Sequence, residues 1–213
     1  MLRSAERKAE RLLARSDLPA SAPPSEIARA LGYRIRIDHR LPPDVEGMLD
    51  PLTSTIIVAR RHAPRQEFTI AHELMEANVP LHLPSEIKEQ WCDRGAAALM
   101  MPARKFLRSG FACDWDLEVL RAWWPSCSWN ALVKRVADLV PGTAAAAWHR
   151  AQLRFRQAHP DIALPDHADG LEEFIALEAM HGSGRSEILL GGLQVRAWRS
   201  GLGRAVTVVR RLG

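Results

Sequence analysis

Hydrophobic side chains recur at helical spacing at the start of the chain and again in its middle. Residues 3–16 place apolar side chains at i, i+4, i+7 and i+8, which predicts an amphipathic helix. The same period predicts helices over 66–78 and 85–101, and Pro80 and Pro102 lie just beyond their ends. Shorter helices are predicted over 26–31, 102–107, 116–123 and 128–139.

Alternating and β-branched runs lie between the first helices. Residues 33–38 alternate with a period of two, and 46–49 and 55–59 are short apolar runs bounded by turn residues, which predicts three strands. Because these strands are close in sequence, we expect them to form a small antiparallel sheet. Ser25 stands before a predicted short helix and is expected to cap its N-terminus.

The last third of the chain has a less distinct pattern. Residues 144–155 suit either a strand or a helix, and 159–169, with two prolines, is expected to be a linker. Residues 171–180 have helical periodicity. Residues 194–198 and 205–210 lie on either side of a glycine-containing turn, which predicts a hairpin.

Composition narrows the class of protein. Hydrophobic residues make up 47% of the 213, enough for an ordinary core, and the net charge of +4 is spread without a long Lys/Arg block. That distribution does not favour direct nucleic-acid binding. Three cysteines without a C-x-x-C pair do not favour a disulfide framework or a thiolate zinc site. With no secretory signal and no membrane-spanning apolar run, the expected location is the cytoplasm.

The most distinctive feature for chemistry is the run His72-Glu73-Leu74-Met75-Glu76. On a helix, His72 and Glu76 are four residues apart and share one face, so both can reach one metal ion. Glu73 follows the first ligand and can act as general base toward a water. The run has the form of H-E-x-x-H with glutamate in place of the second histidine. The alternative interpretation is that this histidine and these glutamates are ordinary solvent-exposed helix residues that bind no metal.

A second group of carboxylates lies on the next predicted helix. Glu89 and Asp93 are four residues apart, and Glu89 can complete a site with His72 and Glu76, because catalytic zinc takes three protein ligands and an open position. One nitrogen and two carboxylates form a harder ligand set, which shifts the preference from Zn²⁺ toward Mn²⁺ or another hard cation. The alternative is that Glu89 and Asp93 are surface charges, with Asp93 paired to Arg94.

Four segments in order resemble the ImmA/IrrE family of metallo-endopeptidases. PPSEIARALG is similar to the family's P-x-x-I-A-x-x-L-G helix, and RQEFTIAHEL to its R-x-R-F-T-x-A-H-E-L active helix. EQWCDRGAAALMMP is similar to its E-x-x-A-D/N-x-F-A-x-x-L-L-M-P helix, and GML followed by TIIV resembles its sheet. The ordered set is more specific than any single segment. The segments span residues 22–32, 47–49 with 55–58, 65–74 and 89–102.

The resemblance implies a zincin-like α+β domain over 1–140, with an active-site helix and a helical lobe, and leaves 141–213 as a small C-terminal α/β extension. It implies His72 as first ligand, Glu73 as base, Glu89 as third ligand and Asp93 as the partner that orients His72. The implied activity is metal-dependent cleavage of a protein substrate such as a helix-turn-helix transcriptional repressor in a stress response. His62 and His82 are candidate donors to the oxyanion.

Two positions depart from the family pattern. Glu76 stands where the family has its second histidine, and Gly95 where it has phenylalanine, so a tryptophan is expected to fill the space beside Gly95. His82 is an alternative ligand, although it follows Pro80 and lies off the helix. The glutamate favours an alternative function, a catalytically lapsed binding module that recognises a regulator without cutting it. A DNA-binding protein is a further alternative, supported only by the basic net charge.

Overall fold

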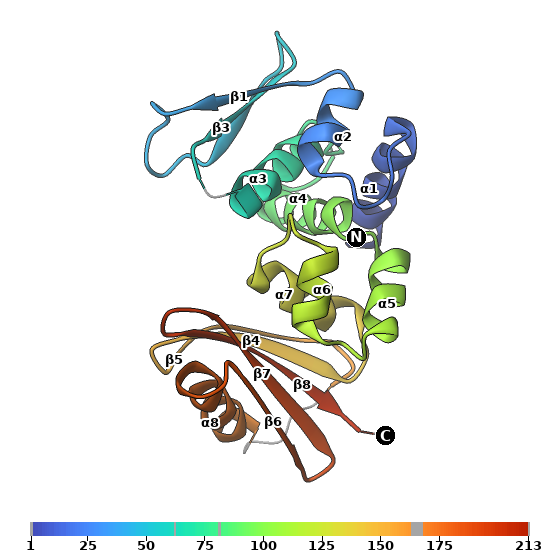
Figure 1. Cartoon of the computed structure of the whole chain (residues 1–213). Coiled ribbons are helices and arrows are strands. Elements are labelled where there is room, and N and C mark those ends of the chain that lie inside the picture. Colours follow the sequence, from blue (N-terminus) through green and yellow to red (C-terminus); the bar gives the residue numbers. More distant parts are fainter. Residues whose placement is uncertain (1, 62, 81, 163–167, 213) are drawn as a thin grey trace. The chain divides into compact units, whose positions relative to one another are not determined.

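The computed structural model describes residues 2–61, 63–80, 82–162 and 168–212 and divides into two compact units. The first comprises the chain up to residue 108 with 124–128, and the second comprises 109–123 with 129 onward. In these described residues, eight helices accompany a three-stranded mixed sheet and a five-stranded antiparallel sheet (Figure 1). The predicted α+β class is confirmed. Residues 129–140 belong to the second compact unit, with the C-terminal sheet. The functional boundary expected at residue 140 stays a prediction.

The first unit layers a small sheet, an inner helix and an outer pair of helices. Helix α3 packs on strands β2 and β3 and on helix α4, which in turn packs on α1 (Figure 1). The predicted long helices and short strands are confirmed to within a few residues. The elements of this part are α1 (Leu2–Ser16), α2 (Pro24–Ala30), β1 (Arg34–Asp38), β2 (Gly47–Asp50), β3 (Thr55–Ala59), α3 (Ala63–Glu76) and α4 (Ser85–Met100). Helix α5 (Ala103–Ala112) begins in the first unit and ends in the second.

The expectation of an all-antiparallel sheet is wrong. The strand order is β1-β3-β2, with β1 parallel to β3 and only β2 antiparallel to it. The apolar strand β3 takes the centre because it is the most buried of the three. The connection after β1, residues 39–46, is long enough to carry β2 to the far side of β3, so closeness in sequence does not impose antiparallel pairing.

Two local expectations also need correction. Helix α2 begins at Pro24 with Pro23 as its N-cap, and Ser25 donates its N–H and its hydroxyl to the Glu67 carboxylate on α3, at 2.9 and 2.8 Å. Proline at the first helical position needs no capping of its own N–H. The space beside Gly95 is filled by the Met75 side chain of α3, not by a tryptophan. The absence of a side chain at Gly95 lets α3 and α4 approach closely.

The second unit is a five-stranded antiparallel sheet in the order β5-β4-β8-β7-β6, with α7 and α8 on opposite faces (Figure 1). The ambiguous run 144–155 belongs to a hairpin of two strands, and the predicted hairpin near the C-terminus is confirmed. Of the expected linker, 163–167 lie outside the described residues. The elements are α6 (Leu117–Trp123), α7 (Trp129–Leu139), β4 (Thr143–His149), β5 (Gln152–Ala158), α8 (Ala168–His181), β6 (Arg185–Leu190), β7 (Leu193–Gly201) and β8 (Arg204–Arg211).

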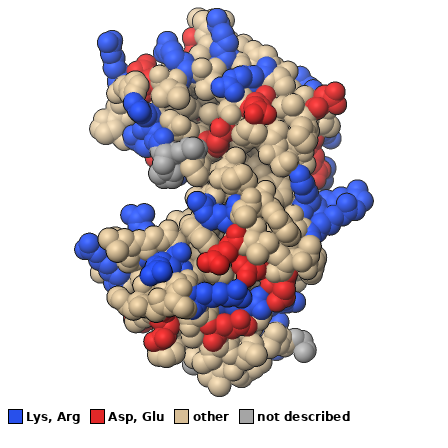
Figure 2. All heavy atoms as spheres, viewed as in Figure 1, with Lys and Arg blue, Asp and Glu red and all other residues tan. Residues whose placement is uncertain are grey.

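Positive and negative side chains are mixed on the face of the molecule drawn in Figure 2. On the face drawn in Figure 2, lysines and arginines alternate with aspartates and glutamates and do not gather in one basic patch. A face of mixed charge does not favour binding to a polyanion. Within the described part of the chain, no helix is both long enough and apolar enough to cross a membrane.

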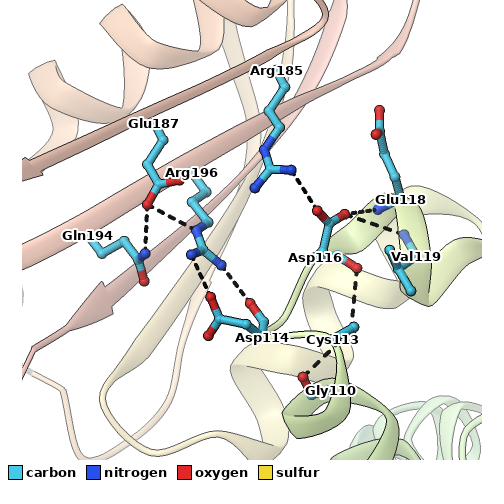
Figure 3. A network of polar contacts seen from close by, with 10 residues as sticks. All are labelled: Gly110, Cys113, Asp114, Asp116, Glu118, Val119, Arg185, Glu187, Gln194 and Arg196. Atoms are coloured by element: carbon cyan, nitrogen blue, oxygen red, sulfur yellow. Dashed lines mark hydrogen bonds and ion pairs between the residues drawn. The ribbon is translucent and has the colours of Figure 1, made fainter.

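The second unit contains a network of ion pairs that we call the arginine clamp (Figure 3). Arg196 on β7 donates to the backbone oxygen and the carboxylate of Asp114, at 2.6 and 2.7 Å, and lies 3.2 Å from Glu187. Arg185 on β6 contacts Asp116 at 2.6 Å. The clamp consists of Asp114, Asp116 and Glu187 with Arg185, Arg196 and Arg210.

The clamp holds a strained turn onto the sheet. Asp114 and Trp115 have φ angles of 48° and 59°, a left-handed conformation that costs an L-residue about 1–2 kcal/mol. The Trp115 indole is buried beside Gly110, where an added side chain would meet the ring. The arginine contacts to Asp114 therefore stabilise a backbone conformation that the local sequence disfavours.

Candidate functional site

The candidate site is built on α3, a helix covered on two sides. Ile70, Leu74 and Met75 are buried in the core of the first unit, which fixes the rotation of the helix. That rotation leaves His72 and Glu76 at the edge where α3 meets α4. The i, i+4 spacing predicted from the sequence therefore places both side chains on one side of the helix, as expected.

His72 is joined to both carboxylates predicted on α4. Its Nδ1 lies 2.9 Å from Asp93 Oδ1, and its Nε2 lies 3.4 Å from Glu89 Oε2. The structure therefore places Asp93 as the hydrogen-bonding partner of His72. Burial acts to lower the pKa of His72, but the Asp93 hydrogen bond and the surrounding carboxylates outweigh it and raise that pKa above its usual value.

Glu73 is the most buried acid of the site. It is only 6% exposed, on the face of α3 that packs against β2. Burial, with a further contribution from Glu76, raises the pKa of Glu73 to about 7. Gly47 on β2 permits this packing, because a Cβ added there would lie 3.0 Å from Glu73 Oε1 and closer still to Thr69. A carboxyl group with such a pKa can accept or donate a proton at neutral pH.

Glu76, the predicted second metal ligand, forms an ion pair with a lysine. Lys88 Nζ on α4 lies 2.5 Å from Glu76 Oε1, and both side chains are about one-third exposed, at 34% and 35%. The hydrogen bond to Glu76 raises the pKa of Lys88, so the amine is firmly an ammonium group at neutral pH. We call His72, Glu73, Glu76, Lys88, Glu89 and Asp93 the carboxylate cluster.

The donor set does not fit a three-ligand metal centre. His72 Nε2 and Glu89 are close enough to share an ion, but Glu76 accepts from Lys88. Over the ranges that the structure describes, no three His, Cys, Asp or Glu side chains are grouped so that they could hold a metal. Burial raises the pKa of the neighbouring Cys92 to about 12, which keeps that thiol protonated and a poor ligand. Metal binding stays a prediction that this arrangement does not favour.

The remaining sequence candidates do not join the cluster. His82 is exposed in the turn between α3 and α4, and none of the contacts among described residues links it to His72. His62 lies outside the described residues. A cavity of about 160 Å³ in the first unit lies elsewhere, lined by Leu12, Arg15, Leu31, Gly32, Tyr33, Ser54 and Asn78.

Two residues of the site were not found by reasoning from the sequence. Lys88 immediately precedes Glu89, and a lysine beside a predicted metal ligand is the signal that could have revealed it. Gly47 carries the weaker signal of a glycine at the start of a predicted strand, which is typical of close backbone approach. The supposed surface pair of Asp93 with Arg94 does not form, since Arg94 pairs with Glu6 of α1 at 2.8 Å.

Comparison with known proteins adds a likeness of fold. No protein-family model matches the chain, and no curated protein matches it. Among solved structures, the chain is similar to a Mycobacterium tuberculosis transcriptional regulator. The TM-score is 0.72 at 17% sequence identity, over 98% of this chain and 76% of that one. At this identity the likeness concerns the fold alone.

Proposed function

We propose that this chain is a protein of transcriptional regulation whose first unit has a peptidase-like, zincin-like fold and recognises a protein partner without cutting it. The ion pair between Lys88 and Glu76 carries the proposal. In the resembled family, the position of Glu76 belongs to a metal ligand. Here its carboxylate accepts a hydrogen bond from the Lys88 ammonium group. The two remaining donors, His72 and Glu89, are fewer than the three protein ligands of a catalytic zinc centre.

A protein can keep the fold of a peptidase after it has lost the residues that cleave a peptide bond. A site whose residues have changed keeps the helices and the surface that once positioned a substrate, because these depend on core packing rather than on the reacting groups. In this chain Ile70, Leu74 and Met75 still bury α3 against its neighbours, while Glu76 has changed from the family pattern. A binding surface beside a lapsed site is consistent with both observations.

The similar solved structure supports a regulatory role. The Mycobacterium tuberculosis protein is described as a transcriptional regulator, and the likeness spans 98% of this chain, so it includes the C-terminal sheet as well as the peptidase-like part. Regulation through a protein partner, such as a helix-turn-helix repressor, agrees with the mixed charge of the face drawn in Figure 2, which does not favour direct nucleic-acid binding there.

The chemistry of the exposed site favours a partner segment with basic residues. Glu89 and Asp93 have side chains that are 70% and 60% exposed, and both stand at the open edge of the cluster. Exposed carboxylates that outnumber the nearby cations attract a lysine or an arginine of a partner. Such charges determine the orientation of the bound partner more than the affinity. Reversing both charges, in Glu89→Lys with Asp93→Lys, is expected to weaken partner binding.

The test combines a peptidase assay with a transcript profile. Purified wild type and Glu73→Gln are incubated with unfolded casein, with and without added Zn²⁺ or Mn²⁺, and neither is expected to cleave it. In cells lacking the gene, wild type and Glu73→Gln are expected to restore the same transcript profile, whereas the charge-reversed variant does not. Cleavage by wild type that Glu73→Gln abolishes, or failure of Glu73→Gln to restore transcription, would overturn the proposal.

A metal-dependent endopeptidase is the second candidate, favoured by Glu73. A buried carboxyl with a pKa near 7 beside a histidine oriented by Asp93 suits a general base. Glu73 would then take a proton from a water and return it to the leaving amine. This candidate predicts that added Zn²⁺ or Mn²⁺ produces cleavage in wild type and in Lys88→Ala, and no cleavage in Glu73→Gln.

A further inference from the structure

Helix α1 carries a row of exposed arginines that we call the arginine stripe. Its members are spaced four residues apart, so they share one face of the helix: Arg3, Arg7, Arg11 and Arg15. Within the ranges that the structure describes, none of these guanidinium groups has a hydrogen-bonding or ion-pair partner. The stripe therefore presents a line of unpaired positive charge to the solvent.

The arrangement of the stripe does not serve the stability of α1. Like charges four residues apart repel each other and destabilise a helix, and each neighbouring pair in the stripe has this spacing. Arg3 lies in the first turn, where the positive end of the helix dipole opposes a cation, and that turn contains no acid. A bound anion would relieve both effects, because it would offset the repulsion between the arginines.

Other charges near the stripe offset it only in part. Helix α1 contains five basic and two acidic side chains, and one of the acids, Glu6, pairs with Arg94 of α4 at 2.8 Å. Lys8 adds a further cation, while Glu10 on α1 and Asp17 just after it are exposed acids. Helix α2, which also packs on α1, carries one acid and one arginine. The residues of α4 that belong to the carboxylate cluster contact α3 instead.

The stripe ends at the cavity of about 160 Å³ in the first unit, which Arg15 helps to line. Arg15 is the only charged residue among the described residues of that lining. Tyr33 and Ser54 also line it, and neither hydroxyl group has a hydrogen-bonding partner within the described part of the chain. Asn78 donates one N–H to the Leu74 carbonyl oxygen and retains a second. These donors are of the kind that a carboxylate accepts from.

We propose that the arginine stripe and this cavity bind an acidic, extended segment of a partner protein, with one of its carboxyl groups in the cavity beside Arg15. Residues four apart on a helix are separated by about 6 Å along its axis. Alternate residues of an extended strand are about 6.7 Å apart, so carboxylates at every second position can meet successive arginines. The inference goes beyond the proposed function, since the stripe lies on α1 and the carboxylate cluster on α3 and α4.

Two observations favour a protein segment over other anions. The apolar side chains of α1, Ala5, Ala9 and Leu12, are buried in the core, so none of them is free to enter a lipid bilayer. Glu10 is exposed between two arginines of the chain, and a phosphate backbone would offer it no cation. A protein segment can place a neutral or basic residue opposite Glu10.

The test measures the binding of synthetic peptides to the full chain by fluorescence anisotropy. The probe is a labelled peptide of about eight residues with glutamate at alternate positions and serine between them. One comparison peptide has glutamine in place of glutamate, and another has the same composition with its glutamates consecutive. A single-stranded oligonucleotide of similar length and vesicles that contain an anionic lipid are the remaining probes.

Arg7→Gln combined with Arg11→Gln removes the middle of the stripe. Arg40→Gln combined with Arg60→Gln is the matched control, since these are exposed arginines of the same unit outside α1. Wild type and control are expected to bind the alternating peptide equally, and the stripe variant about threefold to tenfold more weakly at low salt. Tyr33→Phe, which changes no charge, is expected to weaken binding about threefold. Circular dichroism checks folding, and the stripe variant should be no less stable than wild type because it removes a repulsion.

Several results would overturn the inference. Equal affinity of the stripe variant and its control would mean that the arginines do not hold the peptide, and unchanged binding by Tyr33→Phe would exclude the cavity. Equal affinity for the glutamine peptide or for the consecutive-glutamate peptide would contradict a site for spaced carboxylates. Tighter binding of the oligonucleotide or of the vesicles at the same salt concentration would assign the stripe to another class of partner. None of these results bears on cleavage or on the transcript profile of Glu73→Gln, so the proposed function is tested separately.

Discussion

The carboxylate cluster of the first unit and the arginine clamp of the second differ in charge balance. In the clamp, three carboxylates meet three arginines, and each acid has a guanidinium within 3.7 Å. In the cluster, four carboxyl groups meet one lysine and one histidine, and Arg65, which pairs with Glu46, acts on Asp93 only through its charge. A network with balanced charge stabilises a local conformation, whereas a group of like charges is typical of a site that binds a ligand or a partner.

The two regions also differ in which acid is buried. The clamp acid with the most contacts, Asp114, is 69% exposed, so water compensates for any imperfect pairing. The cluster buries Glu73 to 6% exposure and raises its pKa to about 7, which means that the fold opposes its ionisation. Neutralising an acid in the cluster and removing a cation from the clamp should therefore change stability in opposite directions.

The largest expected effect is stabilisation by Glu73→Gln. The folded-state pKa of about 7 exceeds the usual value of 4.5, so the contribution of this carboxyl to stability is fully present below pH 4.5 and lost as pH rises through 7. Wild type should lose about 2–3 kcal/mol between pH 5 and pH 8 relative to Glu73→Gln. Urea denaturation at several pH values measures this difference. Glu10→Gln on α1 is the control, and a less stable Glu73→Gln at pH 8 would contradict the comparison.

Arg196→Ala tests the clamp. It removes the two hydrogen bonds to Asp114 and the contact with Glu187, and it releases the left-handed turn. We expect the free energy of unfolding to fall by about 2 kcal/mol, in the range for hydrogen bonds to charged groups. The same denaturation experiment measures it, with Arg199→Ala, an exposed arginine on the same strand, as the control. Equal effects of the two substitutions would mean that the clamp does not stabilise the turn.

Gly47→Ala tests how the buried acid is enclosed. The added methyl group would press on Thr69 and Glu73, and overpacking of this size costs about 1–2 kcal/mol. Combining Gly47→Ala with Glu73→Gln should give a non-additive loss, because the two residues are in contact. Gly170→Ala on α8, where an added Cβ meets nothing within 4 Å, is the control and should not destabilise. Full additivity would indicate that β2 does not pack on Glu73.

The smallest effect on stability is expected for Asp93→Asn. The pair with His72 is partly exposed, so the free energy of unfolding should change by less than about 0.5 kcal/mol. The pKa of His72 should nevertheless fall, since Asp93 is the main group that raises it. A proton NMR titration of the His72 ring measures the change. Glu89→Gln should lower the same pKa less, and a larger effect from Glu89 would reverse the assignment of the orienting partner.

Local pattern predicted much of the fold because the signals lie within a few residues. The period of apolar residues over 3–16 and 85–101 gave α1 and α4, and a glycine-containing turn gave the last hairpin. The direction of β1 was predicted wrongly, since it depends on which strand takes the centre of the sheet. Residues 144–155 were ambiguous because alanine has no strong preference for a strand, and pairing with β8 decided the outcome.

Local pattern was enough to predict that His72, Glu73 and Glu76 share a helix, because helical spacing follows from neighbouring residues alone. It also indicated that Glu89 and Asp93 belong to the same site. The contacts of Lys88 with Glu76 and of Gly47 with Glu73 could be learned only from the folded protein, since each joins segments brought together by core packing. The clamp between 113–116 and the C-terminal strands likewise depends on long-range packing, and no pattern along the chain encodes it.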